Sequence, residues 1–254
     1  MSQTHGKEQV VLAVHKYLPD RTIESINDRG IWMRQIYEVR LDGEETIFLK
    51  ITVNSQGITD ARHEARVARL FNENGLPAPQ VLAVDLSGEI IPQPYLIEQS
   101  LGGVRLGALL KQVSQVESLA IYRTLGAFYR KLHAIHHDHS GVWNADPDQI
   151  LPAHPNDYMY RAEIVEGSGR RALELGRISR YTYDRTVSLW ADSLAELKTY
   201  QPSLIHGSPF WWNIYLERDG DGWQVVKLTS LDDVMWWDPA YDLAFLRFPP
   251  FGKS

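Results

Sequence analysis

The most informative segment of the sequence is LIHGSPFWWN, which runs from Leu204 to Asn213. Farther along, the chain reads TSLDD over residues 229–233 and DPAYDLA over residues 238–244. Between these segments, DGDG at 219–222 separates two β-rich runs, Ile214–Leu216 and Gln224–Leu228, which predicts a hairpin. A hairpin brings the residues at its two ends together. The sequence therefore predicts that Asn213 and the 229–233 segment share one site.

The order of these segments resembles the aminoglycoside phosphotransferase family, small-molecule kinases with a protein-kinase-like fold. Its members usually carry an H-G-D-x-x-x-x-N catalytic loop, a metal-binding Asp on the following strand and a D-P-x-x-D-L-A segment. Such spacing lets a turn present a carboxylate to the acceptor hydroxyl while a later Asn binds Mg²⁺. On this pattern Ser208 stands at the catalytic Asp position. Ser230, counted back from Asp238, stands at the metal-binding Asp position.

Both serines remove a charge that the chemistry uses. Near neutral pH a serine hydroxyl is neither an anionic Mg²⁺ ligand nor a base matched to an alcohol proton. The resemblance implies Asn213 as a metal ligand, and Asp232 is the best remaining acidic one. We therefore expect an impaired site. Three explanations stay open: a pseudokinase that keeps a ligand-binding cleft, a deliberately inactivated kinase, and residual catalysis supported by positioning and the remaining oxygen ligands.

The N-terminal half carries a second part of the resemblance. Two β-rich runs, Ile36–Leu41 and Thr46–Ile51, flank Asp42-Gly43 and predict a hairpin. Apolar residues at helical spacing predict a helix over Asp60–Asn74. The resemblance implies that Lys50 contacts nucleotide phosphates and that Glu64 is its ion-pair partner.

The resemblance also implies a nucleotide site and a reaction. The segment from Tyr95 to Gly103 looks like the family's hinge, which makes Glu98 and Ser100 cofactor-binding candidates, and the early loop at 27–30 would hold phosphates. The implied cofactors are ATP and Mg²⁺. The parent reaction is phosphorylation of a hydroxyl on a small polar or cationic molecule, such as an aminoglycoside or another amino-containing compound. A fructosamine or amino-sugar kinase is the alternative parent.

The texture of the chain changes near residue 100, from mainly strand-like to mainly helical. We expect an α+β, two-lobed protein-kinase-like fold, with a nucleotide-binding lobe over 1–100 and a helical lobe with the catalytic-loop hairpin over 101–254. Family members generally continue into further helices, so we expect that C-terminal helices are missing here. The other predicted elements are strands over Gln80–Asp85 and Pro94–Glu98, helices over Leu106–Lys111 and Val116–His136, and one or two helices over Tyr158–Tyr200, interrupted near Gly167–Gly169.

Several residues have supporting roles in this interpretation. Asp242 is expected to orient the catalytic loop through its backbone, and His206 to be a packed support rather than an acid or base. The tryptophans at 211, 212, 236 and 237 are expected in the core. Four histidines, at 133, 136, 137 and 139, fit a solvated helix end better than a zinc site.

Composition excludes several classes of protein. The 254 residues include 26 basic and 32 acidic side chains, a net charge of −6, which does not favour nonspecific binding to nucleic acid. The absence of cysteine excludes disulfides and thiolate chemistry. The first residues lack the pattern of a secretory signal, and no apolar run is long enough to span a bilayer. We expect no nucleic-acid or membrane partner and a cytoplasmic location.

Overall fold

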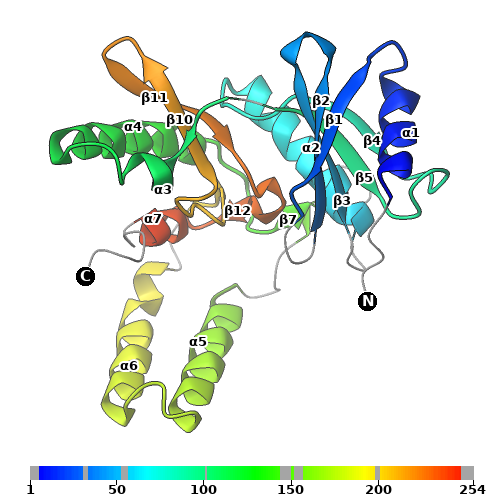
Figure 1. The fold of residues 1–254 in the computed structure, drawn as a ribbon. Helices are drawn as coiled ribbons and strands as arrows, with labels where there is room; N and C mark the ends of the chain where they lie inside the picture. Colours follow the sequence, from blue (N-terminus) through cyan, green and yellow to red (C-terminus); the bar gives the residue numbers. More distant parts are fainter. Residues whose placement is uncertain are drawn as a thin grey trace.

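A computed structural model describes residues 6–30, 34–52, 57–100, 102–143, 150–151, 157–197 and 201–246. Its first half is built on a five-stranded antiparallel sheet with the strand order β1-β2-β3-β5-β4 (Figure 1). The strands are β1 Ile23–Asp28, β2 Arg34–Leu41, β3 Thr46–Thr52, β4 Val81–Asp85 and β5 Tyr95–Gln99.

The hairpin predicted around Asp42-Gly43 is present as β2 and β3. They are joined by a short 3₁₀ turn, η1 Asp42–Glu44, in which Gly43 has a φ of +73°. The helix predicted over Asp60–Asn74 is α2 Gly57–Glu73, and both further strands of this half are present. Helix α2 packs against β3, β4 and β5.

A helix that the sequence interpretation did not include, α1 Lys7–Tyr17, covers the other side of this half. Its buried residues Val10, Ala13 and Val14 join the apolar core of the sheet.

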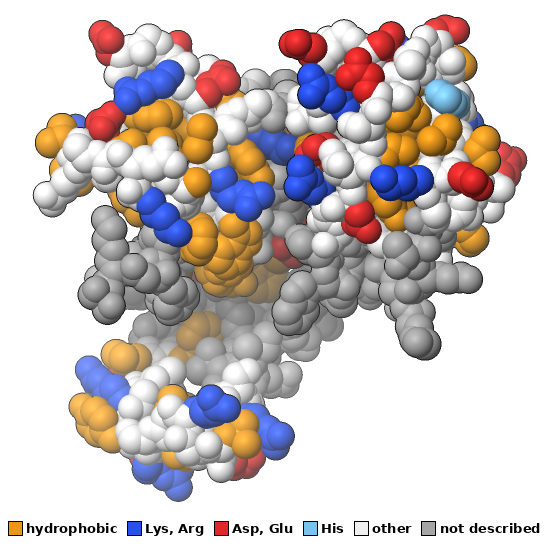
Figure 2. Space-filling view, viewed as in Figure 1, with side chains coloured by type: hydrophobic (Ala, Val, Ile, Leu, Met, Phe, Trp, Pro, Cys, Tyr) orange, Lys and Arg blue, Asp and Glu red, His pale blue; other side chains and the backbone are white. Residues whose placement is uncertain are grey.

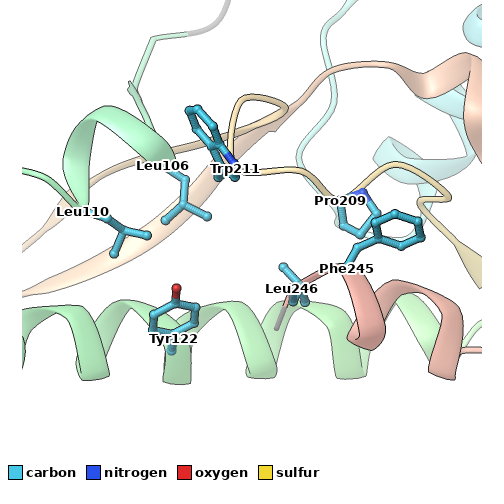
Figure 3. A pocket seen from close by; sticks show the side chains of 7 residues that line it. All are labelled: Leu106, Leu110, Tyr122, Pro209, Trp211, Phe245 and Leu246. Carbon is cyan, nitrogen blue, oxygen red and sulfur yellow. The ribbon is translucent and has the colours of Figure 1, made fainter. Parts of the chain in front are cut away.

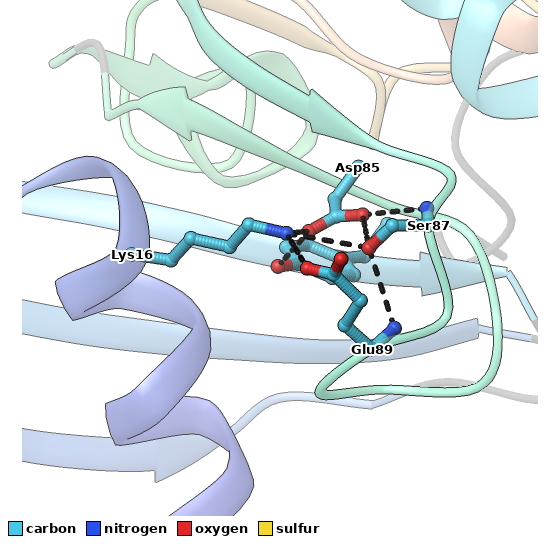
Figure 4. Close-up of polar contacts among 5 residues, drawn as sticks. Lys16, Asp85, Ser87 and Glu89 are labelled. Carbon is cyan, nitrogen blue, oxygen red and sulfur yellow. Dashed lines mark hydrogen bonds and ion pairs between the residues drawn. The ribbon is translucent and has the colours of Figure 1, made fainter.

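A polar network holds the end of α1 to the β4–β5 connection (Figure 4). The buried Asp85 carboxylate accepts hydrogen bonds from Lys16 Nζ at 2.9 Å and from Tyr95 OH at 2.7 Å. It also accepts from the backbone N–H and the hydroxyl of Ser87, both at 2.7 Å. Lys16 Nζ lies 2.8 Å from Glu89 Oε2 as well. These contacts, chiefly the Tyr95 hydroxyl, outweigh burial and hold the pKa of Asp85 far below its usual value.

The second half is mainly helical and carries the late hairpin. Helix α4 begins with a capping box between Ser114 and Glu117 and contributes Ile121, Leu125 and Leu132 to a second core. The predicted hairpin is present as β10 and β11, and β6 pairs with the free edge of β10. The elements are β6 Val104–Arg105, α3 Leu106–Leu109, α4 Gln115–His133, β7 Val142–Trp143, β8 Ile150–Leu151, α5 Asp157–Glu174, α6 Arg180–Leu197, β9 Ser203–Ile205, β10 Ile214–Asp219, β11 Gly222–Leu228, η2 Leu231–Asp233, β12 Met235–Trp237 and α7 Ala240–Leu246.

The region over 157–197 forms two helices that pack on each other and stand apart from the rest of the molecule (Figure 1). The predicted interruption near Gly167–Gly169 is wrong, because both glycines lie inside α5. The chain turns instead at Gly176, whose φ is +64° and whose N–H bonds to Leu173 O. Glycine inside a helix costs about 1 kcal/mol but does not end it, whereas glycine in the left-handed region caps it.

No helix among the described residues is long and apolar enough to cross a membrane.

Candidate active site

Lys50 lies in a buried cluster with two carboxylates. Strand β3 places Lys50, α2 places Glu64 and β5 places Glu98. Lys50 Nζ lies 2.5 Å from Glu64 Oε1 and 2.8 Å from Glu98 Oε1. Burial alone would lower the pKa of Lys50, but the two carboxylates outweigh it and raise the pKa. Burial raises the pKa of Glu98, and Lys50 opposes that shift. Lys50 is therefore a charged group held between two elements of the first half.

Ser100, the other cofactor candidate on this segment, lies at the end of β5. Its backbone N–H donates to Thr46 O at 2.8 Å, so this donor is used within the sheet. The prediction of a loop over 27–30 is partly wrong, because Asn27 and Asp28 belong to β1 and pair with β2. After β1, Gly30 N–H donates to Asp28 Oδ1 at 2.8 Å. The structure thus brings Glu98, but not the Ser100 amide, to Lys50.

Residues 206–213, which the sequence interpretation predicts to be the catalytic loop, follow β9 and are held by Asp242 of α7. Asp242 Oδ2 accepts from His206 N at 2.8 Å, and Oδ1 accepts from Gly207 N at 2.9 Å. The orienting role expected for Asp242 is present in the structure. His206 is fully buried, and its Nε2 lies 2.9 Å from Thr229 O. Burial lowers the pKa of His206, in keeping with a packed, neutral support.

His133 completes this arrangement, a contact that sequence reasoning missed. Its Nε2 lies 3.0 Å from Asp242 Oδ2, so α4 and α7 both fix the loop. The sequence interpretation placed His133 with three neighbouring histidines. Its carboxylate partner lies far along the chain, where linear spacing gives no signal. Of the other histidines, His136 also has a distant partner, Ser203 Oγ, whereas His137 contacts the nearby His139 O.

Ser208 lies in the loop before the β10–β11 hairpin, and Ser230 lies just after it. Asn213 Nδ2 donates to Ser208 O at 2.9 Å, and Asn213 Oδ1 accepts from Thr229 Oγ1 at 3.2 Å. Thr229 directly precedes Ser230, which is half-buried and has the left-handed conformation φ +61°, ψ +46°. The hairpin therefore brings Ser208, Asn213 and Thr229 into contact, and Ser230 is the next residue along the chain.

These side chains do not fit a tightly held Mg²⁺ as ligands, because magnesium prefers anionic oxygen ligands in an octahedral shell. Ser208 before the hairpin and Ser230 after it offer only hydroxyls, and the amide oxygen of Asn213 already accepts a hydrogen bond. Asp232 lies half-buried on η2 and has an interaction of its own. In the described part of the chain, no three His, Asp or Glu side chains are grouped as metal ligands.

Aromatic side chains surround the loop. Phe210 stacks on Trp212 with ring centroids 4.5 Å apart, and Trp212 is 41% exposed. Trp236 and Trp237 are buried, as expected, whereas the expectation of a core position for Trp212 is wrong because its side chain extends from the loop rather than from a strand. Beneath the loop lies a small apolar cavity between α3, α4 and α7 (Figure 3), lined by Leu106, Leu110, Tyr122, Pro209, Trp211, Phe245 and Leu246.

Lys227 on β11 is a second charged group that sequence reasoning missed. Its Nζ lies 4.9 Å from the ring centroid of Phe48 on β3 and 5.3 Å from that of Tyr215 on β10. Lys227 thereby links the hairpin to the sheet. We call the place where Phe48, Glu98, Tyr215 and Lys227 meet the interlobe junction. In the space-filling view, the boundary between the two upper parts carries basic side chains (Figure 2).

Solved structures show what class of fold this is. The GDP complex of wild-type aminoglycoside 2'-phosphotransferase-IIIa matches with a TM-score of 0.68 and 14% identity, over 95% of this chain and 78% of that chain. The streptomycin–ATP complex of APH(2")-IIa matches with a TM-score of 0.65 and 15% identity, over 96% and 76%. A structure assigned as a fructosamine-3-kinase from Thermobifida fusca matches with a TM-score of 0.60 and 19% identity, over 95% and 78%. The fold is the two-lobed, protein-kinase-like α+β fold.

Sequence comparison then gives the family. Residues 28–252 match the model of the phosphotransferase enzyme family, APH. Since this match covers most of the chain, the protein belongs to that family. A search of curated proteins found no match.

Proposed function

We propose that this protein binds a nucleotide between its two lobes and that its capacity for phosphoryl transfer is impaired. The parent reaction is transfer of the ATP γ-phosphoryl group to a hydroxyl of a small polar or cationic molecule. In this proposal Ser208 faces the acceptor, and Lys50, which pairs with Glu64, binds nucleotide phosphates. We take residue 100 as the boundary between the lobes and the cytoplasm as the location.

One observation carries this proposal: the Lys50–Glu64 ion pair and the loop held by Asp242 are both present, yet positions 208 and 230, where the family has carboxylates, carry serine hydroxyls. Phosphoryl transfer depends on positioning and on neutralising charge at the phosphates. The positioning framework is retained, and the groups that would hold Mg²⁺ and accept the hydroxyl proton are absent from their positions. Binding is therefore expected to survive better than turnover.

A comparison of two double variants tests this proposal. Ser208→Asp/Ser230→Asp restores both carboxylates, and Ser25→Asp/Ser168→Asp adds the same charge at two exposed sites as a matched control. Each protein is measured by thermal shift with ADP, with and without Mg²⁺, and by ATP turnover with kanamycin, streptomycin, gentamicin and fructosamines as candidate acceptors. A ligand that binds the native state raises the melting temperature.

In the unmodified chain we expect ADP to raise the melting temperature with little dependence on Mg²⁺, and turnover to be near background. The Ser208→Asp/Ser230→Asp variant should gain both Mg²⁺-dependent binding and at least about a hundredfold in turnover, since it carries a general base and an anionic metal ligand. The control should behave like the unmodified chain. Turnover by the unmodified chain as fast as that of the Ser208→Asp/Ser230→Asp variant would show that the site is not impaired. A lack of any nucleotide-dependent shift would show that the site does not bind nucleotides.

The acceptor is proposed only as a class. The solved neighbours bind kanamycin, streptomycin or gentamicin, which suggests an amino-containing hydroxyl compound. The acceptor panel separates aminoglycosides from fructosamines as parent substrates.

A further inference from the structure

Two buried charged groups at the interlobe junction have hydrogen-bonding capacity that no described residue uses. The Glu98 side chain pairs with Lys50 through Oε1, while its Oε2 is buried without a hydrogen-bond partner. The Lys227 ammonium makes no hydrogen bond or ion pair with any described residue. The two residues are only 1% and 5% exposed. Buried groups of this kind normally have partners, because leaving them unpaired is costly.

The surroundings of Lys227 stabilise a positive charge but leave its donors free. The next residue, Leu228, belongs to the core of the second half, so strand alternation turns Lys227 toward the sheet. There the rings of Phe48 and Tyr215 lie on the ammonium at 4.9 and 5.3 Å. Aromatic faces attract a cation but are not lone-pair acceptors, and an ammonium has three N–H donors. Lys227 therefore still needs an oxygen or nitrogen acceptor.

The charges around Lys227 do not compensate for burying its ammonium group without a hydrogen-bond acceptor. Burial lowers the pKa of Lys227 more than Glu98 and Glu64 raise it, and Lys50 and Arg105 add to the lowering. A purely structural link between the lobes would be served at least as well by an apolar side chain of similar length. The retained pair of one unused acceptor and one unused donor group points to a ligand that supplies their complements.

We propose that Lys227 Nζ and Glu98 Oε2 form a polar subsite for the edge of a planar ligand that carries an N–H donor beside a lone-pair acceptor. This inference rests on the proposed function and names the part of the nucleotide that the junction binds. Adenine presents such an edge with N6–H₂ beside N1, and guanine with N1–H beside O6. Lys227 donates to N1 or O6, and Glu98 accepts from the neighbouring N–H.

Three nucleotides test the subsite in the unmodified chain: ADP, GDP and purine riboside 5'-diphosphate, measured by isothermal titration calorimetry. The last compound keeps N1 but has no N–H donor on this edge. We expect it to bind about tenfold or more weakly than the tighter of ADP and GDP, because Glu98 Oε2 stays unpaired. The preference between ADP and GDP identifies which base the edge belongs to.

Variants separate the subsite from general effects. Lys227→Met keeps the length of the side chain and removes its donors, Lys227→Gln keeps a neutral donor, and Lys131→Met removes an exposed lysine on α4 as the control. We expect Lys227→Met to weaken the preferred nucleotide about ten- to hundredfold, Lys227→Gln to weaken it less, and the control to bind normally. The melting temperature of ligand-free Lys227→Met should be unchanged or higher, because a desolvated cation is removed.

The outcomes distinguish this inference from the proposed function. If ADP or GDP binds but purine riboside 5'-diphosphate binds equally well, the subsite is wrong and nucleotide binding stands. Unchanged nucleotide affinity in Lys227→Met would overturn the subsite in the same way. If the unmodified chain binds none of the three nucleotides, the proposed function fails and the subsite fails with it. Because the comparison of nucleotides uses the unmodified chain, it remains decisive even if a variant does not fold.

Discussion

Gly207 occupies a place in the catalytic loop that only glycine fits. Its φ is +76°, and a Cβ there would lie 2.2 Å from the backbone oxygen of Asp233. The close approach brings the loop against η2, and the Gly207 N–H reaches Asp242. Ser230 also has a left-handed backbone conformation, but it is not a glycine, and this conformation costs a non-glycine residue about 1–2 kcal/mol. At the scale of single residues, the site is thus defined by backbone geometry as much as by side chains.

Gly207→Ala should destabilise the protein by about 2 kcal/mol or more, because both the backbone conformation and the contact with Asp233 oppose a Cβ. Gly126→Ala is the matched control: Gly126 lies inside α4 with nothing near its Cβ position, so alanine should stabilise by about 0.5–1 kcal/mol. Urea denaturation measures both free energies of unfolding. Equal effects of the two changes would contradict this account of the loop.

Helices at both ends of the chain are fixed to the strands by buried aspartates. Asp85 joins α1 to the β4–β5 connection, and Asp242 joins α7 to the catalytic loop and to His133 of α4. In both cases the carboxylate accepts several hydrogen bonds from separate elements. Removing one carboxylate oxygen as a hydrogen-bond acceptor should therefore weaken the attachment of a whole helix or loop and not only one contact.

Asp85→Asn should destabilise the protein by about 1–3 kcal/mol at pH 7, because Lys16 and Tyr95 lose a charged acceptor. The effect should depend on pH. The folded pKa of Asp85 is depressed, so its contribution is fully present well above the unfolded value of about 3.9 and is lost as the pH falls toward the folded value. The difference in unfolding free energy between the unmodified chain and Asp85→Asn should narrow from pH 6 to pH 3.

Asp221→Asn, in the exposed β10–β11 turn, is the control for this titration and should show little effect at any pH. A difference for Asp85→Asn that stays constant down to pH 3 would contradict the assigned direction of the pKa shift.

Asp242→Asn should destabilise by about 1–3 kcal/mol and release the loop, because one of the two carboxylate oxygens becomes an N–H₂ donor facing N–H groups. The backbone amides of His206 and Gly207 should then exchange with deuterium faster than those of β5. Asp219→Asn, at the exposed end of β10, provides the comparison. Unchanged exchange at both amides would mean that the loop does not depend on Asp242.

At the scale of the molecule, the two halves share an apolar core, in which Val67, Ala68 and Phe71 of α2 pack with buried residues of the second half. Lys227 reaches Phe48 across the interlobe junction, and α2 packs against η2 next to Ser230. The α5–α6 pair stands apart from both halves (Figure 1). A ligand at the junction therefore acts on contacts that span the lobes while leaving α5 and α6 untouched.

Saturating ADP should slow hydrogen exchange of amides in β3, β5 and β11 and leave α5 and α6 unchanged, because ligand binding suppresses openings that break the site. Mass spectrometry of deuterium uptake with and without ADP measures this. Protection confined to the α5–α6 pair would place the nucleotide elsewhere in the molecule.

Pattern and spacing along the chain were sufficient to predict the two hairpins, most of the other helices and strands, and the contact of Asp242 with the backbone at residues 206 and 207. Periodicity, turn residues and motif spacing are local, so they can be read along the chain. The contacts of Glu98 with Lys50, of His133 with Asp242 and of Lys227 with Phe48 could not be predicted in this way. Those contacts depend on which strands and helices become neighbours. The burial that leaves Glu98 and Lys227 short of partners exists only once both halves have packed together.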